Sequence, residues 1–193
     1  MSKVTLLTTQ QNIDMQKELA VFALGQSRQN PDADWELYKK IVNVNHHENQ
    51  LRHFHLMFHI TGISSRAHVY LVRHVFTTPT VQSLRYTQPN SFGIVMPESY
   101  SNLPEKIYEE VTEAVNMAAD VYRRMLALGV KKEDACYILP QGTKINLTYE
   151  TNMQQLRHII SQRIAPGAHW EIRDVMEQVV STCKKMDYIK DII

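Results

Sequence analysis

Several residue types are scarce in this chain of 193 residues, and each scarcity excludes a class of protein. The two cysteines, Cys136 and Cys183, form neither a CxxC motif nor a disulfide framework, so we expect two reduced thiols in the core. Six glycines and seven prolines exclude collagen-like and low-complexity chains. Neither a signal-peptide stretch nor a membrane-spanning apolar run is present, which predicts a cytoplasmic protein.

An excess of charge of either sign is also missing. The chain has 21 basic and 20 acidic side chains, and its formal net charge is +1. Such a balance gives no general reason to bind nucleic acid or an anionic membrane. Hydrophobic residues make up 44% and charged residues 21%, which is typical of a folded domain. The length favours a single domain over residues 1–193.

Hydrophobic periodicity predicts an α+β fold with long helices and a mixed or antiparallel sheet. Helical spacing of apolar residues occurs at 14–24, 34–44, 64–74, 102–128, 152–164 and 169–186, with one further turn at 131–135. Strand-like alternation occurs at 51–60 and 144–150, and 92–96 is expected to form a short strand. Expected helix N-caps are Asp34, Ser64 or Ser65, and Asn102; Gly129 is an expected stop. An irregular segment is expected from Pro79 to about residue 90.

Histidine is unusually concentrated, because seven of the nine histidines lie between His46 and His74. His53, His55 and His59 share one face of the predicted strand at 51–60. No further carboxylate or cysteine lies at ligand spacing beside them, so we expect a packed or cleft-lining face and no metal site.

The segment Arg73-His74-Val75 is followed, after seven residues, by Ser83-Leu84-Arg85-Tyr86. Two guanidinium groups and a hydroxyl can converge on a phosphate, although composition alone favours a solvated loop. Arg163 ends a predicted helix, where it is either a partner of the helix dipole or a third arginine for the same anion. The segment Ala168-His169-Trp170-Glu171-Ile172 is by itself only the start of a helix.

Together these segments resemble the flavin-dependent thymidylate synthase family. The family signature is R-H-R, seven residues and Ser, and Arg73-His74-Val75 with Ser83 keeps that spacing without the third arginine. Further matching segments occur in the family's order, from about residue 45 to 175: Phe58-His59-Ile60-Thr61-Gly62-Ile63-Ser64, Ile138-Leu139-Pro140, Thr151-Asn152, Leu156-Arg157-His158, Arg163 and Ala168-His169-Trp170-Glu171-Ile172.

The resemblance implies that the protein methylates dUMP to dTMP reductively, with FAD as cofactor and with methylenetetrahydrofolate and NADPH as co-substrates. It also implies a homotetramer whose active sites form between subunits. The implied catalytic residues are Ser83, which polarises dUMP, and Arg163, which favours loss of the N3 proton of uracil. The implied dUMP-binding residues are Tyr70, Arg73, Gln82, Ser83, Leu84, Arg85 and Arg163. The implied FAD-binding residues are His47, Asn49, Arg73, His74, Val75, Asn152 and His158.

The chain departs from the family pattern at several of these sites. Val75, Asn146 and Gln154 each stand where the family has an arginine. Val81 and Arg52 each stand where an acidic residue is usual, and Tyr70 stands where the family has a dUMP-binding glutamine. Two alternatives therefore remain beside the thymidylate synthase interpretation. One is a diverged enzyme that modifies another pyrimidine nucleotide with an altered cofactor, and the other is a non-catalytic nucleotide-binding protein on the same scaffold.

Overall fold

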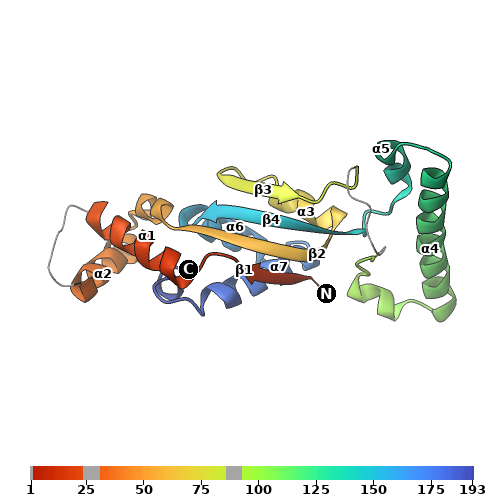
Figure 1. Ribbon diagram of the computed structural model, residues 1–193. Coiled ribbons are helices and arrows are strands. Elements are labelled where there is room, and N and C mark those ends of the chain that lie inside the picture. The colour runs from red at the N-terminus through yellow and green to blue at the C-terminus, as the bar shows by residue number, and fades with distance from the viewer. Residues whose placement is uncertain (1, 24–30, 86–92) are drawn as a thin grey trace.

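A four-stranded sheet forms the centre of the computed structural model, which describes residues 2–23, 31–85 and 93–193. The strand order is β1-β2-β4-β3, and each neighbouring pair is antiparallel (Figure 1). The strands are β1 (Lys3–Leu6), β2 (His55–Ser64), β3 (Thr77–Val81) and β4 (Lys144–Asn152). The predicted α+β class is thus confirmed, and the sheet has the antiparallel form.

The helices surround this sheet unevenly (Figure 1). Helices α6 (Met153–Arg163) and α7 (Trp170–Cys183) lie against one face, while α1 (Gln10–Ala23) and α2 (Pro31–Lys39) lie at one end. Helix α4 (Glu105–Ala127) stands at the other end with the short α5 (Lys132–Ala135), and α3 (Ser65–Leu71) follows β2 directly. Short 3₁₀ and π segments are η1 (Lys40–Val44), η2 (Glu48–His53), η3 (Glu98–Asn102), η4 (Cys136–Ile138) and η5 (Ile189–Asp191).

The core lies between the sheet and the two helices behind it. Alternate residues of β2 are fully buried, namely Leu56, Phe58 and Ile60, whereas His55 and His59 are exposed. Period-two alternation of a strand places these sets on opposite faces, as the sequence predicts. The buried face meets apolar residues of α6 and α7: Leu156, Ile159, Val175, Met176 and Val179.

The predicted strand at 51–60 starts too early. Residues 48–53 form the 3₁₀ helix η2, and the strand begins at His55. Leu51 and Phe54 are both fully buried and three positions apart; this spacing puts them on one side of a helical turn, whereas a strand would place them on opposite faces. His53 consequently does not share the strand face of His55 and His59.

The expected irregular segment after residue 79 is also wrong in part, because Thr77–Val81 forms β3. Pro79 is tolerated there because β3 is an edge strand that pairs with β4 alone. Strand β1 is not anticipated by the sequence. Of the expected strand at 92–96, residue 92 lies outside the described residues, and Ile94 makes an isolated bridge to Thr143.

Two of the helix boundaries expected from the sequence agree with the structure, those at Ser64 and Gly129. Ser64 Oγ accepts a hydrogen bond from Ala67 N at 2.9 Å, and Gly129, with φ of 85°, follows α4. Asp34 is not an N-cap, because α2 begins at Pro31 and Asp34 is buried within it. Asn102 is not one either, since Pro104 precedes the first residue of α4.

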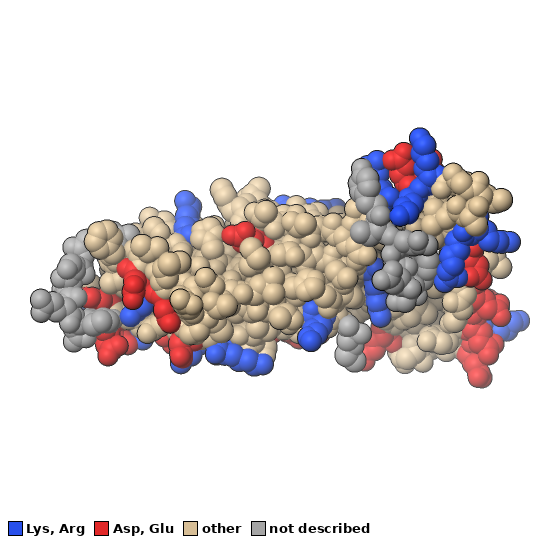
Figure 2. Space-filling model, viewed as in Figure 1, with Lys and Arg blue, Asp and Glu red and all other residues tan. Residues whose placement is uncertain are grey.

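Some apolar side chains on and just after α4 are exposed. Ile107 is 42% exposed, Met117 66% and Leu128, which follows the helix, 85%, whereas Ala119 and Tyr122 are buried. Figure 2 shows that the face over β2 and β3 carries few charged side chains, which gather instead at the two ends of the molecule. Among the described helices, none is long and apolar enough to cross a membrane.

The two cysteines differ in their surroundings. Cys183 is fully buried, as predicted, and burial raises the pKa of its thiol to about 12. Cys136 is only partly buried, so the expectation of two core thiols is wrong for it. Both are free thiols in the structure, and the reduced state of the chain stays a prediction.

Candidate functional site

Helix α3 carries the first part of the site, and a buried carboxylate fixes its start. Glu171 of α7 is 3% exposed, and its two oxygens accept hydrogen bonds from Ser64 N at 2.6 Å and Ser64 Oγ at 2.5 Å. The same Ser64 hydroxyl oxygen caps α3 through Ala67 N. The first turn of α7 therefore determines where α3 begins.

Three arginines gather around one aromatic ring at the end of α3. The guanidinium carbons of Arg66, Arg73 and Arg163 lie 6.0, 5.8 and 5.7 Å from the centroid of the Tyr70 ring. The Tyr70 ring also stacks on His169, with centroids 5.4 Å apart. Cation–π attraction holds such groups over an aromatic face. The arrangement concentrates positive charge and suits an anionic ligand.

His74 links this cluster to α6. Arg163 Nε donates a hydrogen bond to His74 Nε2 at 3.0 Å, and the His74 ring meets His158 edge to face at 6.5 Å. Burial, the charge of Arg163 and that of His158 lower the pKa of His74. His74 thus accepts the Arg163 hydrogen bond through Nε2 and orients the guanidinium, and its lowered pKa favours the unprotonated ring that can act as this acceptor.

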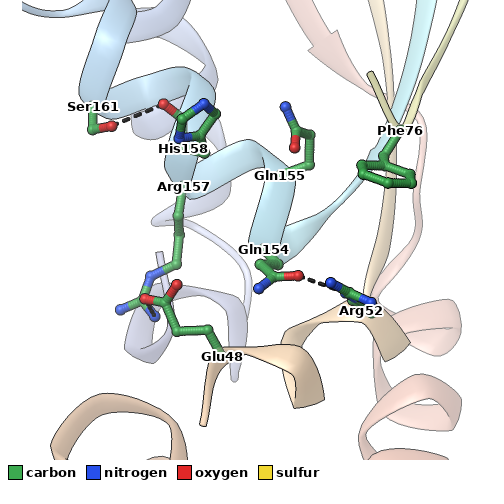
Figure 3. A pocket seen from close by; sticks show the side chains of 8 residues that line it. All are labelled: Glu48, Arg52, Phe76, Gln154, Gln155, Arg157, His158 and Ser161. Carbon is green, nitrogen blue, oxygen red and sulfur yellow. Dashed lines mark hydrogen bonds and ion pairs between the residues drawn. The ribbon is translucent and has the colours of Figure 1, made fainter. Parts of the chain in front are cut away.

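A hollow that His158 of this cluster helps to line opens in front of α6 (Figure 3). It has a volume of about 620 Å³ and is lined by Glu48, Arg52, Phe76, Gln154, Gln155, Arg157, His158 and Ser161. Its lining contains two arginines, a histidine and two amides against one carboxylate. Phe76 is 73% exposed and has a positive φ of 56°, a conformation rarely adopted by bulky residues. The hollow therefore offers hydrogen-bond donors and an aromatic ring to a ligand with anionic and ring groups.

The loop after β3 carries the other predicted nucleotide residues. Ser83 Oγ accepts a hydrogen bond from Arg85 N at 3.3 Å, and Arg85 Nη2 lies 2.6 Å from Glu133 Oε2 of α5. Gln82 Oε1 accepts from Asn146 N at 3.1 Å, and Leu84 packs on the core. Arg85 thus contacts α5 as well as its own loop.

The structure brings together a subset of the site residues predicted from the sequence. Tyr70, Arg73, His74, His158 and Arg163 form one connected cluster. The remaining predicted residues lie elsewhere: Ser83 and Arg85 in the β3 loop, His47 and Asn49 at the start of η2, Val75 exposed at 67%, and Asn152 as the cap of α6 through Gln155 N.

Several residues of the site were not predicted to act there. Arg66 and His169 join the Tyr70 cluster, whereas Glu48, Gln155 and Phe76 line the hollow. The sequence does single out the segment around His169, although helix N-termini of this kind are common. Arg66 lies one turn before Tyr70, a helical spacing that would have found it.

The exposed face of β2 carries His55 and His59, and His55 lies near a carboxylate of the neighbouring strand. His55 Nδ1 lies 3.6 Å from Glu150 Oε1 on the neighbouring β4, and both side chains are solvent-accessible. Among the residues that the structure describes, no group of three His, Cys, Asp or Glu side chains is arranged to hold a metal ion. The absence of a metal site stays a prediction.

A positively charged, partly aromatic cluster lies beside an open hollow on an antiparallel α+β scaffold, an arrangement whose chemistry suits anionic ligands that contain rings. The sequence model of the family "Thymidylate synthase complementing protein" matches residues 5–187. The chain therefore belongs to this family, that of the flavin-dependent thymidylate synthases.

Individual relatives agree with this assignment. The chain is 34% identical over 151 residues to the flavin-dependent thymidylate synthase of Thermococcus onnurineus, a match that covers 76% of this chain and 61% of that protein. It is 32% identical over 151 residues to that of Pyrococcus abyssi, covering 76% and 62%. The chain thus spans about three-fifths of the length of these relatives.

Solved structures support the fold. A crystal structure of Thymidylate Synthase X from Helicobacter pylori with FAD and dUMP matches with a TM-score of 0.72 at 22% identity, covering 94% of this chain and 93% of that one. A second structure of that enzyme, complexed with FAD and dUMP, gives a TM-score of 0.71 at 23% identity.

Proposed function

We propose that this protein is an enzyme that methylates dUMP to dTMP reductively, using FAD, methylenetetrahydrofolate and NADPH. The observation that carries the proposal is the Arg163–His74–Tyr70–Arg73 cluster beside the hollow in front of α6, in a chain of the flavin-dependent thymidylate synthase family. Relatives of this family are named flavin-dependent thymidylate synthases, and the similar solved structures contain FAD and dUMP.

The nucleotide would be held by charge-assisted hydrogen bonds. Arg73 and Arg85 would bind the phosphate, and the Ser83 hydroxyl, next to Gln82 and Leu84, would polarise the base. Arg85 is 57% exposed and pairs with Glu133, so nucleotide binding would draw its guanidinium away from an exposed carboxylate. Such exposed ion pairs contribute about 0–1 kcal/mol, which a phosphate contact can replace.

Arg163 would stabilise the reacting base. Its guanidinium is oriented by His74, whose Nε2 accepts the hydrogen bond from Arg163 Nε. A positive charge next to the uracil ring stabilises the anion formed when N3 loses its proton, more strongly than it stabilises the neutral base. The low pKa of His74 matters here, because a protonated ring could not accept the Arg163 hydrogen bond.

The residues that line the hollow fit FAD, because arginine, histidine and amide donors suit its phosphates and Phe76 suits an aromatic ring. Bound there, FAD would carry hydride from NADPH to the nucleotide. His158, Arg73 and His74 would contact it from the cluster, and Val75, His47, Asn49 and Asn152 from the surrounding turns. Asn152 also caps α6, because its side-chain oxygen accepts a hydrogen bond from Gln155 N.

We further propose a single domain over residues 1–193 that assembles into a homotetramer in the cytoplasm, without nucleic acid or a membrane as partner. The family model spans nearly the whole chain, and the free thiols suit a reducing compartment. The exposed apolar residues of α4 and the weakly charged sheet face supply surfaces for association. Light scattering is expected to report four chains per particle at micromolar concentration; a monomeric mass would contradict an active site shared between subunits.

The function is tested first by ligand binding. The purified protein is expected to be yellow and to bind dUMP, and Arg85→Ala is expected to weaken dUMP binding by about 1.5–3 kcal/mol, because a charge-assisted hydrogen bond to phosphate is lost. Isothermal calorimetry measures this affinity, with Arg123→Ala of α4 as a control outside the site.

The outcomes separate the three functional interpretations. Tritium release from C5-labelled dUMP in the presence of all co-substrates supports the synthase. A protein that binds FAD and dUMP but releases no tritium is a diverged enzyme. Binding of dUMP without FAD indicates the non-catalytic nucleotide-binding protein. Unchanged dUMP affinity in Arg85→Ala contradicts the assignment of Arg85.

A further inference from the structure

Two of the pocket side chains, Arg52 of η2 and Gln154 of α6, lie across one corner of the hollow in front of α6 (Figure 3). Arg52 Nε donates a hydrogen bond to Gln154 Oε1 at 2.6 Å, although the two residues are 102 positions apart in the chain. Because the amide holds Nε, the orientation of the planar guanidinium is set, and its two terminal nitrogens remain available as donors.

The other arginine of the hollow is already engaged. Arg157 Nη1 lies 3.5 Å from Glu48 Oε1, and Arg157 Nη2 donates to Asn43 Oδ1 at 3.0 Å. Among the described residues that line the hollow, Glu48 is the one carboxylate. Within the described part of the chain, no carboxylate forms an ion pair with Arg52. The surplus positive charge of the hollow therefore belongs to Arg52.

The surroundings of Arg52 suit a phosphate attached to a ring. Gln154 and Gln155 belong to the first turn of α6, where the helix dipole favours an anion. The exposed ring of Phe76 lies on the same side of the hollow as Arg52 (Figure 3). A guanidinium, the positive end of a helix and an exposed aromatic ring thus converge on one space.

We propose that Arg52 is the phosphate-binding cation of this hollow and that Gln154 is the positioning residue that orients it. In this chain the positive charge is carried by Arg52 of η2, whereas Gln154, in the first turn of α6, is a neutral amide. The ligand class is a nucleoside diphosphate group, as in ADP or in the ADP half of FAD. This inference rests on the proposed function only for the identity of FAD as the physiological ligand.

The first measurement is the affinity of the full chain for FAD and for ADP, by fluorescence and calorimetry, at low and high salt. Arg52→Gln is expected to weaken binding of both ligands by about 10- to 100-fold, the loss typical of a charge-assisted hydrogen bond. The affinity of this variant is also expected to fall less with salt, since one ionic contact is gone. Arg123→Gln, on the surface of α4 beside Asp120, should leave both affinities unchanged.

The second measurement exchanges the two side chains. Because Arg52 and Gln154 are in contact, an arginine at 154 reaches the same space. The double variant Arg52→Gln, Gln154→Arg is expected to recover most of the lost affinity and the original salt dependence. Gln154→Leu, which keeps Arg52 but removes its amide partner, should weaken binding less than Arg52→Gln does.

The results distinguish this inference from the proposed function. Parent protein that binds FAD, with Arg52→Gln binding it equally well, overturns the role of Arg52 and leaves the synthase proposal intact. Binding of ADP that depends on Arg52, without FAD binding, supports the phosphate site and contradicts the flavin enzyme. Failure of the parent protein to bind either ligand overturns both.

Discussion

Arg163→Gln is expected to lower kcat for dTMP formation by about 100- to 1000-fold, the usual loss when one preorganised electrostatic group is removed. The change should appear in kcat more than in the affinity for dUMP, because the charge acts mainly on the deprotonated base. Arg163→Lys keeps the charge but lacks the planar Nε–H that donates to His74, so it should recover little of the lost turnover. Tritium release from C5-labelled dUMP measures the rate.

The same variant carries a readout that does not depend on activity. The charge of Arg163 opposes protonation of His74, so its removal is expected to raise the pKa of His74. The pKa should still stay below the ordinary histidine value, because burial is the largest cause of the shift and persists. An NMR titration of the imidazole signals checks this. Unchanged kcat together with an unchanged His74 pKa, as expected for Arg123→Gln, would remove Arg163 from the site.

Glu171→Ala is expected to cause the largest loss of stability among the polar residues of the site. The substitution leaves Ser64 N and Ser64 Oγ without their buried acceptor, and each hydrogen bond to a charged group contributes about 1.5–3 kcal/mol. We expect the free energy of unfolding to fall by about 2–4 kcal/mol. At this chain length such a loss lowers Tm by roughly 5–15 °C.

Urea denaturation with Glu177→Ala as the matched control tests this expectation. Glu177 lies on the same helix but is exposed, so its removal should change stability by less than about 0.5 kcal/mol. Glu171→Gln keeps one acceptor oxygen and should fall between the two. Equal stabilities of Glu171→Ala and Glu177→Ala would show that the carboxylate does not fix the start of α3.

The elements that the sequence predicts well are those whose pattern is local. Alternation in β2 and β4, the Ser64 cap and the apolar spacing in α6 and α7 each depend on neighbours in the chain, so sequence alone suffices. The errors have a common cause. The alternating pattern of β2 continues back to Leu51 when it is followed along the chain alone, but the burial of both Leu51 and Phe54 belongs to a helical turn, and Pro79 is accommodated at the edge of the sheet, where β3 pairs with β4.

For the site, too, the sequence indicates which residues take part but not how they pair. Family resemblance in the sequence indicates Tyr70, Arg73, His74, His158 and Arg163, and these five residues do meet in the fold. Their pairing could not be predicted, because α3 and α6 are separated by about half of the chain and are brought together only by the sheet. The Arg52–Gln154 contact could not be predicted for the same reason, since the two residues are far apart in the chain. Both residues depart from the family pattern, and the fold makes them neighbours.

The sequence by itself thus determined the fold class, the buried strand faces and the family, because these depend on the order and periodicity of side chains. Tertiary structure alone decided which charges face one another. The pairing of Arg157 with Glu48, the pairing of Arg85 with Glu133 and the lowered pKa of His74 beside Arg163 all arise from distances between segments that are remote in the chain. Electrostatic energies depend on separation and burial in space, and neither quantity is encoded by the local pattern of residues.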